Sequence, residues 1–130
     1  MIVIDASAVL ELLLNTPAAP RVAERVFAPA ETLHAPHLID LEVAQVLRRY
    51  VAAGELEPLR GAEALDDLAD LPLLRYPHDI FLSRIWELRH NATAYDAAYI
   101  ALAEALDAPL LTCDGAIGSV PGHRARVIAL

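Results

Sequence analysis

Short apolar runs alternate with longer helical patterns along the chain, and this alternation restricts the fold more than any other feature. The apolar runs cover residues 2–5, 33–35, 73–76, 110–113 and 126–129. Helical patterns between them are expected at residues 7–14, 20–27, 36–53, 58–71, 79–90 and 93–107. Strands separated by helices pair in parallel, because a parallel connection needs a crossover. The sequence therefore predicts an α/β fold: a mostly parallel central sheet flanked by helices on both faces, in one domain over residues 1–130.

Proline and glycine give the expected ends of the third helix. Pro36 fits the first turn of that helix, and Gly54 ends it. Glu42 lies within this helix at the border of an apolar stripe. The stripe predicted to face the core consists of Ile39, Val43, Val46 and Tyr50.

The composition predicts one soluble globular domain. Hydrophobic residues make up 56% of its 130 residues, which favours a buried sheet together with a protein interface. No apolar run approaches the ~18 residues that a membrane helix needs. The start of the chain has no basic segment, and Asp5 interrupts its apolar run, so we do not expect a signal peptide. Cys113 is the only cysteine, which excludes an intrachain disulfide and fits a cytoplasmic protein.

The basic residues are all of one type. Ten arginines and no lysine face eighteen acidic residues, for a net charge of −8. Mechanisms that need a catalytic lysine are thereby excluded. A general polyanion-binding surface is also disfavoured, since non-specific affinity for nucleic acid comes from cations that neutralise phosphates. A nucleic-acid substrate would have to be bound by a few arginines, by a metal ion, or by both.

Four carboxylates lie at the edges of apolar segments. Asp5 and Asp114 follow predicted strands, and Glu42 and Asp96 lie in predicted helices. Ligands of open α/β sheets bind at the carboxyl ends of strands, and acids without a matching lysine suit a divalent cation. The residues therefore predict a metal-dependent enzyme that acts on phosphates.

Each acid taken alone also has a structural explanation. Asp5 is a favoured residue for capping the next helix. Asp96 follows Thr93 by three residues, which is the spacing of a capping box. Asp114 and Gly115 form a common turn dipeptide. The functional interpretation therefore depends on all four acids meeting at one end of the sheet.

Four segments, in order, resemble the PIN-domain family and, more narrowly, the VapC-type toxins of bacterial toxin–antitoxin pairs. They are Ile2-Val3-Ile4-Asp5-Ala6-Ser7-Ala8-Val9, Leu38-Ile39-Asp40-Leu41-Glu42-Val43, Thr93-Ala94-Tyr95-Asp96-Ala97-Ala98-Tyr99-Ile100-Ala101-Leu102-Ala103 and Leu111-Thr112-Cys113-Asp114. Together they span essentially the whole chain. Each motif alone is weak, and the ordered set is specific.

The resemblance implies a Mg²⁺- or Mn²⁺-dependent endoribonuclease. The positions matching the catalytic and metal-binding acids are Asp5, Glu42, Asp96 and Asp114, and Ser7 and Thr112 match supporting polar positions. Gly115 and Ala116 stand where many relatives carry further charges, which leaves a fifth acidic ligand and a second metal without support. The resemblance also implies a cognate antitoxin as partner and an RNA substrate, and the apolar content favours a homodimer.

Two further groups of residues are candidates for contacts. Arg48 and Arg49 lie on the helix of Glu42 and are candidate contacts for RNA phosphates, although at least one of them is better explained as a solvated surface residue. Trp86, Tyr95 and Tyr99 are assigned to the core or an interface rather than to base stacking. The five histidines show no zinc-like spacing, and no glycine-rich phosphate loop is present.

Three other classes share some of these features. A phosphatase with Asp5 as nucleophile would need a second aspartate where Ser7 stands, and a lysine. A phosphorylated receiver-like domain also expects a lysine. A PIN-like module that has lost activity and only binds its partner would keep the fold without the chemistry. Incubation with RNA, with and without Mg²⁺ or Mn²⁺, separates an enzyme from such a module.

Overall fold

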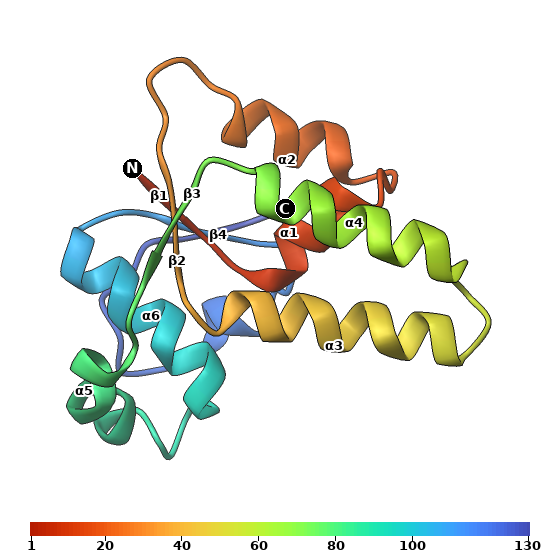
Figure 1. The fold of residues 1–130 in the computed structure, drawn as a ribbon. Coiled ribbons are helices and arrows are strands. Elements are labelled where there is room, and N and C mark those ends of the chain that lie inside the picture. The colour runs from red at the N-terminus through yellow and green to blue at the C-terminus, as the bar shows by residue number, and fades with distance from the viewer.

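The computed structural model describes residues 1–130 and contains one five-stranded sheet (Figure 1). Every pair of neighbouring strands is parallel, so the predicted α/β class is confirmed. The sheet order is β3-β2-β1-β4-β5. The strands are β1 (Ile2–Ile4), β2 (Leu33–Pro36), β3 (Leu73–Tyr76), β4 (Leu110–Thr112) and β5 (Val127–Ala129).

Helices cover both faces of this sheet. The first two crossovers contain α1 (Ala6–Leu13), α2 (Ala19–Val26), α3 (Ile39–Ala52) and α4 (Pro58–Asp70), which lie together on one side of the sheet in Figure 1. The third crossover contains a 3₁₀ turn (Asp79–Phe81), α5 (Leu82–Glu87) and α6 (Ala94–Leu106), and these lie on the other side. A second 3₁₀ turn (Ile117–Ser119) precedes β5. None of the helices is long and apolar enough to cross a membrane.

The direction of the connections reverses at the centre of the sheet. From β1 the chain proceeds outward to β2 and β3, and it then returns past β1 to place β4 on the other side. Crossovers that leave β1 and enter β4 therefore lie on opposite faces. Such a reversal opens a crevice at the carboxyl ends of the two central strands, where ligands of open α/β sheets bind.

The core explains the composition of the central elements. All residues of β1 and β4 are buried, as expected for parallel strands that are covered on both faces. Helix α6 has seven consecutive buried residues, from Ala97 to Ala103. Its alanines let the helix approach β1, β2 and β4 closely, while Tyr99, Ile100 and Leu102 fill the remaining space.

Two expectations about local structure were wrong. Pro36 is the last residue of β2, paired with Tyr76 of β3, and the third helix begins at Ile39. A proline is tolerated at this strand end, where its missing N–H leaves the rest of the ladder intact. The helix predicted over residues 79–90 is only a 3₁₀ turn and the short α5. Neither piece has a fully buried residue, and only Phe81 and Ile85 pack partly against the core, which is too short an apolar face to extend the helix.

The predicted apolar stripe of α3 was also rotated from its true position. Its buried residues are Ile39, Val43 and Leu47. Val46 is only partly buried against the core, Tyr50 is exposed, and both line a cavity. The remaining predicted elements match the structure to within one or two residues at each end, which is the usual spread at fraying ends.

Candidate active site

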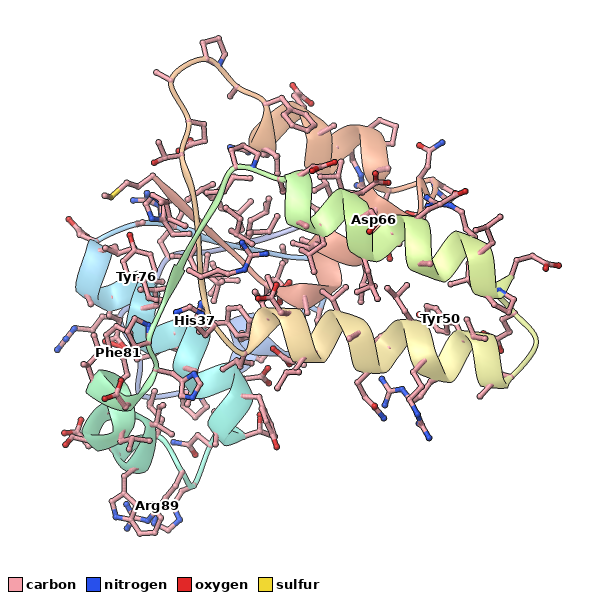
Figure 2. The ribbon with its side chains drawn as sticks, in the orientation of Figure 1. His37, Tyr50, Asp66, Tyr76, Phe81 and Arg89 are labelled. Atoms are coloured by element: carbon pink, nitrogen blue, oxygen red, sulfur yellow. The ribbon has the colours of Figure 1, made fainter.

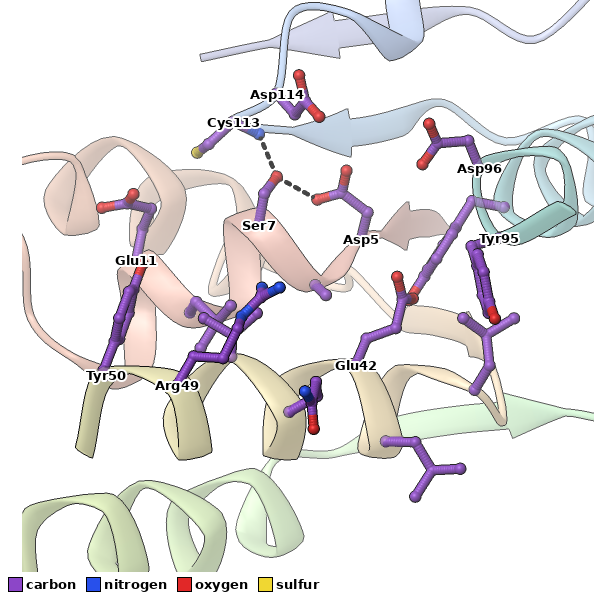
Figure 3. A pocket seen from close by; sticks show the side chains of 17 residues that line it. Asp5, Ser7, Glu11, Glu42, Arg49, Tyr50, Tyr95, Asp96, Cys113 and Asp114 are labelled. Atoms are coloured by element: carbon purple, nitrogen blue, oxygen red, sulfur yellow. Dashed lines mark hydrogen bonds between the residues drawn. The ribbon is translucent and has the colours of Figure 1, made fainter. Parts of the chain in front are cut away.

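The fold brings the four candidate acids to one edge of the sheet. Asp5 follows β1 and Asp114 follows β4, at the carboxyl ends of the two central strands. Glu42 and Asp96 lie in the first turns of α3 and α6, which approach this edge from opposite faces. All four side chains line one cavity of about 730 Å³ (Figure 3).

Asp5 is the most deeply buried of these acids and is bound through both carboxylate oxygens. Only 7% of the residue is exposed. Its Oδ1 accepts hydrogen bonds from the Ser7 hydroxyl at 2.6 Å and from the Ala8 backbone N–H at 3.1 Å, the second of which caps α1. The Thr112 hydroxyl donates to Oδ2. The cap and the site are thus the same carboxylate, so the structural and functional explanations of Asp5 do not exclude each other.

The two hydroxyls that bind Asp5 are themselves held by the backbone after β4. The N–H of Cys113 donates to Ser7 Oγ at 2.9 Å, and the N–H of Asp114 donates to Thr112 Oγ1 at 2.9 Å. Each hydroxyl therefore accepts a hydrogen bond from a backbone N–H and donates its own hydrogen bond to Asp5. This network fixes the Asp5 carboxylate relative to the segment that carries Asp114.

Glu42 is held from the opposite face of the sheet by Tyr99. The Tyr99 hydroxyl donates to Glu42 Oε1 at 2.7 Å, joining α6 to α3. Tyr99 is only 2% exposed, so its ring is core, as predicted for this residue. Its hydroxyl, however, reaches the cavity, and sequence reasoning missed this contact. The signal available was its position three residues after Asp96, on the same face of α6.

Asp96 and Asp114 are less constrained than Asp5. The Thr93 hydroxyl caps α6 by accepting from the Asp96 backbone N–H at 3.2 Å, but the Asp96 carboxylate makes no return bond and no other hydrogen bond within the protein. Only half of the capping box therefore forms. The exposed Asp114 carboxylate accepts one bond, from the Ala116 N–H at 3.0 Å. Most of the oxygen lone pairs of these two acids are free for a ligand.

Burial and mutual repulsion raise the pKa values of three of the acids. Burial raises the pKa of Asp5. Hydrogen bonds from Ser7 and Thr112 oppose this effect, whereas the negative charge of Asp114 adds to it. Burial raises the pKa of Glu42, and the charges of Asp96 and Asp5 add to it. The pKa of Asp96 is raised by burial and then by Asp114 and Asp5. Such a cluster favours a proton or a cation in the cavity.

The donor set fits a hard cation that keeps much of its water. No three histidine, cysteine, aspartate or glutamate side chains converge closely enough to form a ready-made cage. Mg²⁺ is commonly bound through one or two carboxylates, waters and substrate phosphates, and it does not need such a cage. The cavity offers only carboxylate oxygens as strong ligands, apart from the Cys113 side chain.

The structure separates the two candidate arginines. Arg49 lines the cavity, whereas Arg48 lies outside it on the solvent side of α3. Of the three aromatic residues assigned to the core or an interface, Trp86 and Tyr95 are not in the core. They are 68% and 63% exposed, and Tyr95 lines the cavity.

Sequence reasoning missed three polar residues that line the cavity. Gln45 and Tyr50 are three and eight residues from Glu42 on α3, and Glu11 is four residues from Ser7 on α1. These spacings place them on the helix faces of residues already selected, and that periodicity was the available signal. Glu11 is partly engaged, because its carboxylate accepts a bond from the Thr16 hydroxyl.

These features define an α/β protein with a carboxylate-lined cavity at the reversal point of a parallel sheet. The model of the PIN domain family matches residues 2–122. Ribonuclease VapC12 of Mycobacterium tuberculosis is 42% identical over 127 residues, covering 98% of this chain and 97% of the relative. Ribonuclease VapC9 of the same species is 47% identical over 114 residues, covering 88% and 86%. The chain belongs to the PIN domain family.

A solved structure agrees with this assignment. PAE2754 from Pyrobaculum aerophilum superimposes with a TM-score of 0.68 at 25% sequence identity. The match covers 97% of this chain and 82% of that one. The resemblance stated from the four sequence segments is therefore confirmed at the level of family and fold.

Proposed function

We propose that this protein is a metal-dependent endoribonuclease and acts as the toxin of a type II toxin–antitoxin pair. The observation that carries the proposal is the meeting of Asp5, Glu42, Asp96 and Asp114, from four separate elements, around one cavity. The names of the relatives, which are ribonucleases of the VapC type, support RNA as the substrate.

The contacts of each acid indicate its role in the proposed hydrolysis. A bound Mg²⁺ or Mn²⁺ supplies charge stabilisation at the phosphate and lowers the pKa of water. Asp5 and Asp114, which the hydroxyl network ties together, are the proposed direct ligands. Asp96, whose carboxylate has no protein partner and whose pKa is raised, accepts a proton from the attacking water. Glu42, oriented by Tyr99, positions that water.

The reaction adds one water across one P–O bond. The water oxygen bonds to phosphorus as its proton passes to Asp96, and the leaving ribose oxygen takes up a proton from solvent water as its bond to phosphorus breaks. Because the product ends depend on which P–O bond breaks, end mapping reports on the chemistry directly.

The test is cleavage of bacterial total RNA by the purified protein. We expect discrete cuts with Mg²⁺ or Mn²⁺, mapped as new 5′ ends, and none with EDTA. Cleavage that persists in EDTA would contradict the metal role. A folded protein that cuts no RNA with either metal would leave the inactive binding module as the better description.

The same proposal includes an antitoxin, a homodimer and a cytoplasmic location. A nuclease that acts on cellular RNA needs an inhibitor in the same compartment. The net charge of −8 and the acidic cavity suit a basic, amphipathic segment, in which an arginine or lysine pairs with the cavity acids. Exposed apolar side chains, including Leu41, Ile80 and Trp86, provide surface for protein contacts.

A further inference from the structure

The cavity has two chemically different ends. Figure 3 shows Asp5, Glu42, Asp96 and Asp114 at one end, with Arg49, Tyr50 and a single acid, Glu11, toward the other. One stripe of α3 joins the ends, because residues 42, 45, 46, 49 and 50 repeat at helical spacing and all line the cavity. Seven residues along a helix correspond to about 10 Å. The far end therefore lies about two turns of α3 from Glu42.

Arg49 is the only cationic side chain that lines the cavity. It takes part in none of the ion pairs of the protein, which use the N-terminal amine and four other arginines, Arg60, Arg75, Arg84 and Arg124. Figure 3 shows its side chain rising from α3 into the space toward α1. Although acids line the same cavity, Arg49 pairs with none of them. Its guanidinium donors are therefore available to an anionic ligand.

Tyr50 and Gln45 give this end of the cavity the means to bind a base. Tyr50 is 38% exposed and lines the cavity, so part of its ring is accessible. Stacking of a base on an aromatic ring is tolerant of sequence, whereas a glutamine amide can read a base edge. Trp86 and Arg89, which stack on each other at 4.7 Å, line neither end, and Figure 2 shows Arg89 far from Tyr50.

We propose that the Arg49 end of the cavity is a subsite for the nucleotide that flanks the cleaved phosphate. Arg49 binds the flanking phosphate through its fork of donors, Tyr50 stacks on the attached base, and Gln45 contacts the base edge. The acid end binds the scissile phosphate with its cation. This inference rests on the proposed ribonuclease function, and it adds the direction in which the RNA strand lies: along α3, from Glu42 toward Tyr50.

The adjacent arginine provides a matched control. Arg49→Ala and Arg48→Ala remove the same side chain from neighbouring positions of α3, one inside the cavity and one outside it. KM and kcat are measured on an oligoribonucleotide that spans a cleavage site mapped in total RNA. We expect Arg49→Ala to raise KM about tenfold, the loss of one charge-assisted contact, with kcat changed by less than about threefold. Arg48→Ala should leave both within about twofold.

A binding measurement tests the same contact without catalysis. Fluorescence anisotropy of the labelled oligoribonucleotide in EDTA gives the affinity over a range of salt concentrations. Arg49→Ala should lower the slope of log K against log salt by about 0.7, the value for one phosphate of a single strand. Tyr50→Ala should weaken binding about tenfold, and Tyr50→Phe, which keeps the ring, should not. Equal thermal melts exclude misfolding of the variants.

The possible results separate the subsite from the ribonuclease function. If the wild type cleaves RNA but Arg49→Ala behaves as Arg48→Ala does, the subsite is wrong and the ribonuclease stands. A fall in kcat at unchanged KM for Arg49→Ala would also overturn the subsite, because it would place Arg49 at the reacting phosphate. If the wild-type protein makes no cuts in bacterial total RNA, the proposed function fails, and the subsite fails with it.

Discussion

The hydroxyl of Thr112 donates a hydrogen bond to the carboxylate of Asp5 across a separation of 107 residues in the chain. The bond joins the ends of β4 and β1, the two neighbouring strands between which the connections change face. Its position means that the sheet must be assembled before the Asp5 carboxylate has its final orientation. The site is therefore complete only when β1 and β4 are paired in the sheet.

The first prediction concerns the charge of Asp5. Asp5→Asn should reduce RNA cleavage on the order of 10³-fold, because an amide cannot supply the negative charge that the cation needs. The fold should persist, since asparagine caps a helix about as well as aspartate. Circular dichroism and 5′-end mapping measure the two effects. An Asp5→Asn variant with wild-type cleavage would eliminate Asp5 as a metal ligand.

The second prediction is that a divalent cation stabilises the folded protein. A ligand that binds only the native state at 100 times its Kd adds about 2.7 kcal/mol. For a domain of this size that corresponds to roughly 10 °C in Tm. Differential scanning calorimetry with Mn²⁺ measures the shift, and Asp5→Asn is the matched control, in which the shift should shrink. An equal shift in both proteins would show that the ion binds elsewhere.

The third prediction concerns pH in the absence of metal. The pKa values of Asp5, Glu42 and Asp96 are raised, so the native state binds protons more tightly than the unfolded state does. Stability should therefore fall as pH rises above the ordinary aspartate value of 3.8 and through the raised values. Urea unfolding between pH 4 and 7 should show Asp5→Asn gaining stability relative to wild type as pH rises. A difference that is independent of pH would contradict the shift at Asp5.

The fourth prediction tests the contact between Tyr99 and Glu42. Tyr99→Phe removes the hydroxyl and keeps the buried ring, so it should cost roughly 1 kcal/mol of stability, the typical net value of a hydrogen bond. Cleavage should fall about tenfold, as expected when a residue that orients a metal-site carboxylate is lost. Tyr95→Phe is the control, because the Tyr95 hydroxyl makes no hydrogen bond within the protein. Equal losses in the two variants would mean that the hydroxyl of Tyr99 has no specific role.

The fifth prediction concerns the antitoxin. Co-expression with the neighbouring open reading frame should yield a complex that co-purifies and does not cleave RNA. Replacing basic residues of the bound segment with alanine should restore cleavage, because they pair with the cavity acids. If the neighbouring protein does not bind, or if it binds without inhibiting cleavage, the proposed inhibition is wrong.

The sequence by itself determined the parallel α/β class and most ends of the elements, and it led to the hypothesis that the four acids form one site. These features follow from local periodicity and from the rule that strand ends share an edge of a parallel sheet. The apolar run Ile2 to Ile4, which forms β1, and the capping residue Asp5, which bonds to the Ala8 N–H, are examples, since both signals lie within a few residues of the chain.

Only the tertiary structure decided the rotation of α3 and the contacts across the cavity. Local pattern could not distinguish Leu47, which is buried, from Val46 and Tyr50, which line the cavity, because all three are apolar or amphipathic and lie within about one turn of each other. The packing of α3 against its neighbours sets that rotation. The same packing places Arg49 inside the cavity and Arg48 outside it, and it brings Tyr99 to Glu42 from another helix, because contacts between distant segments depend on how the layers assemble.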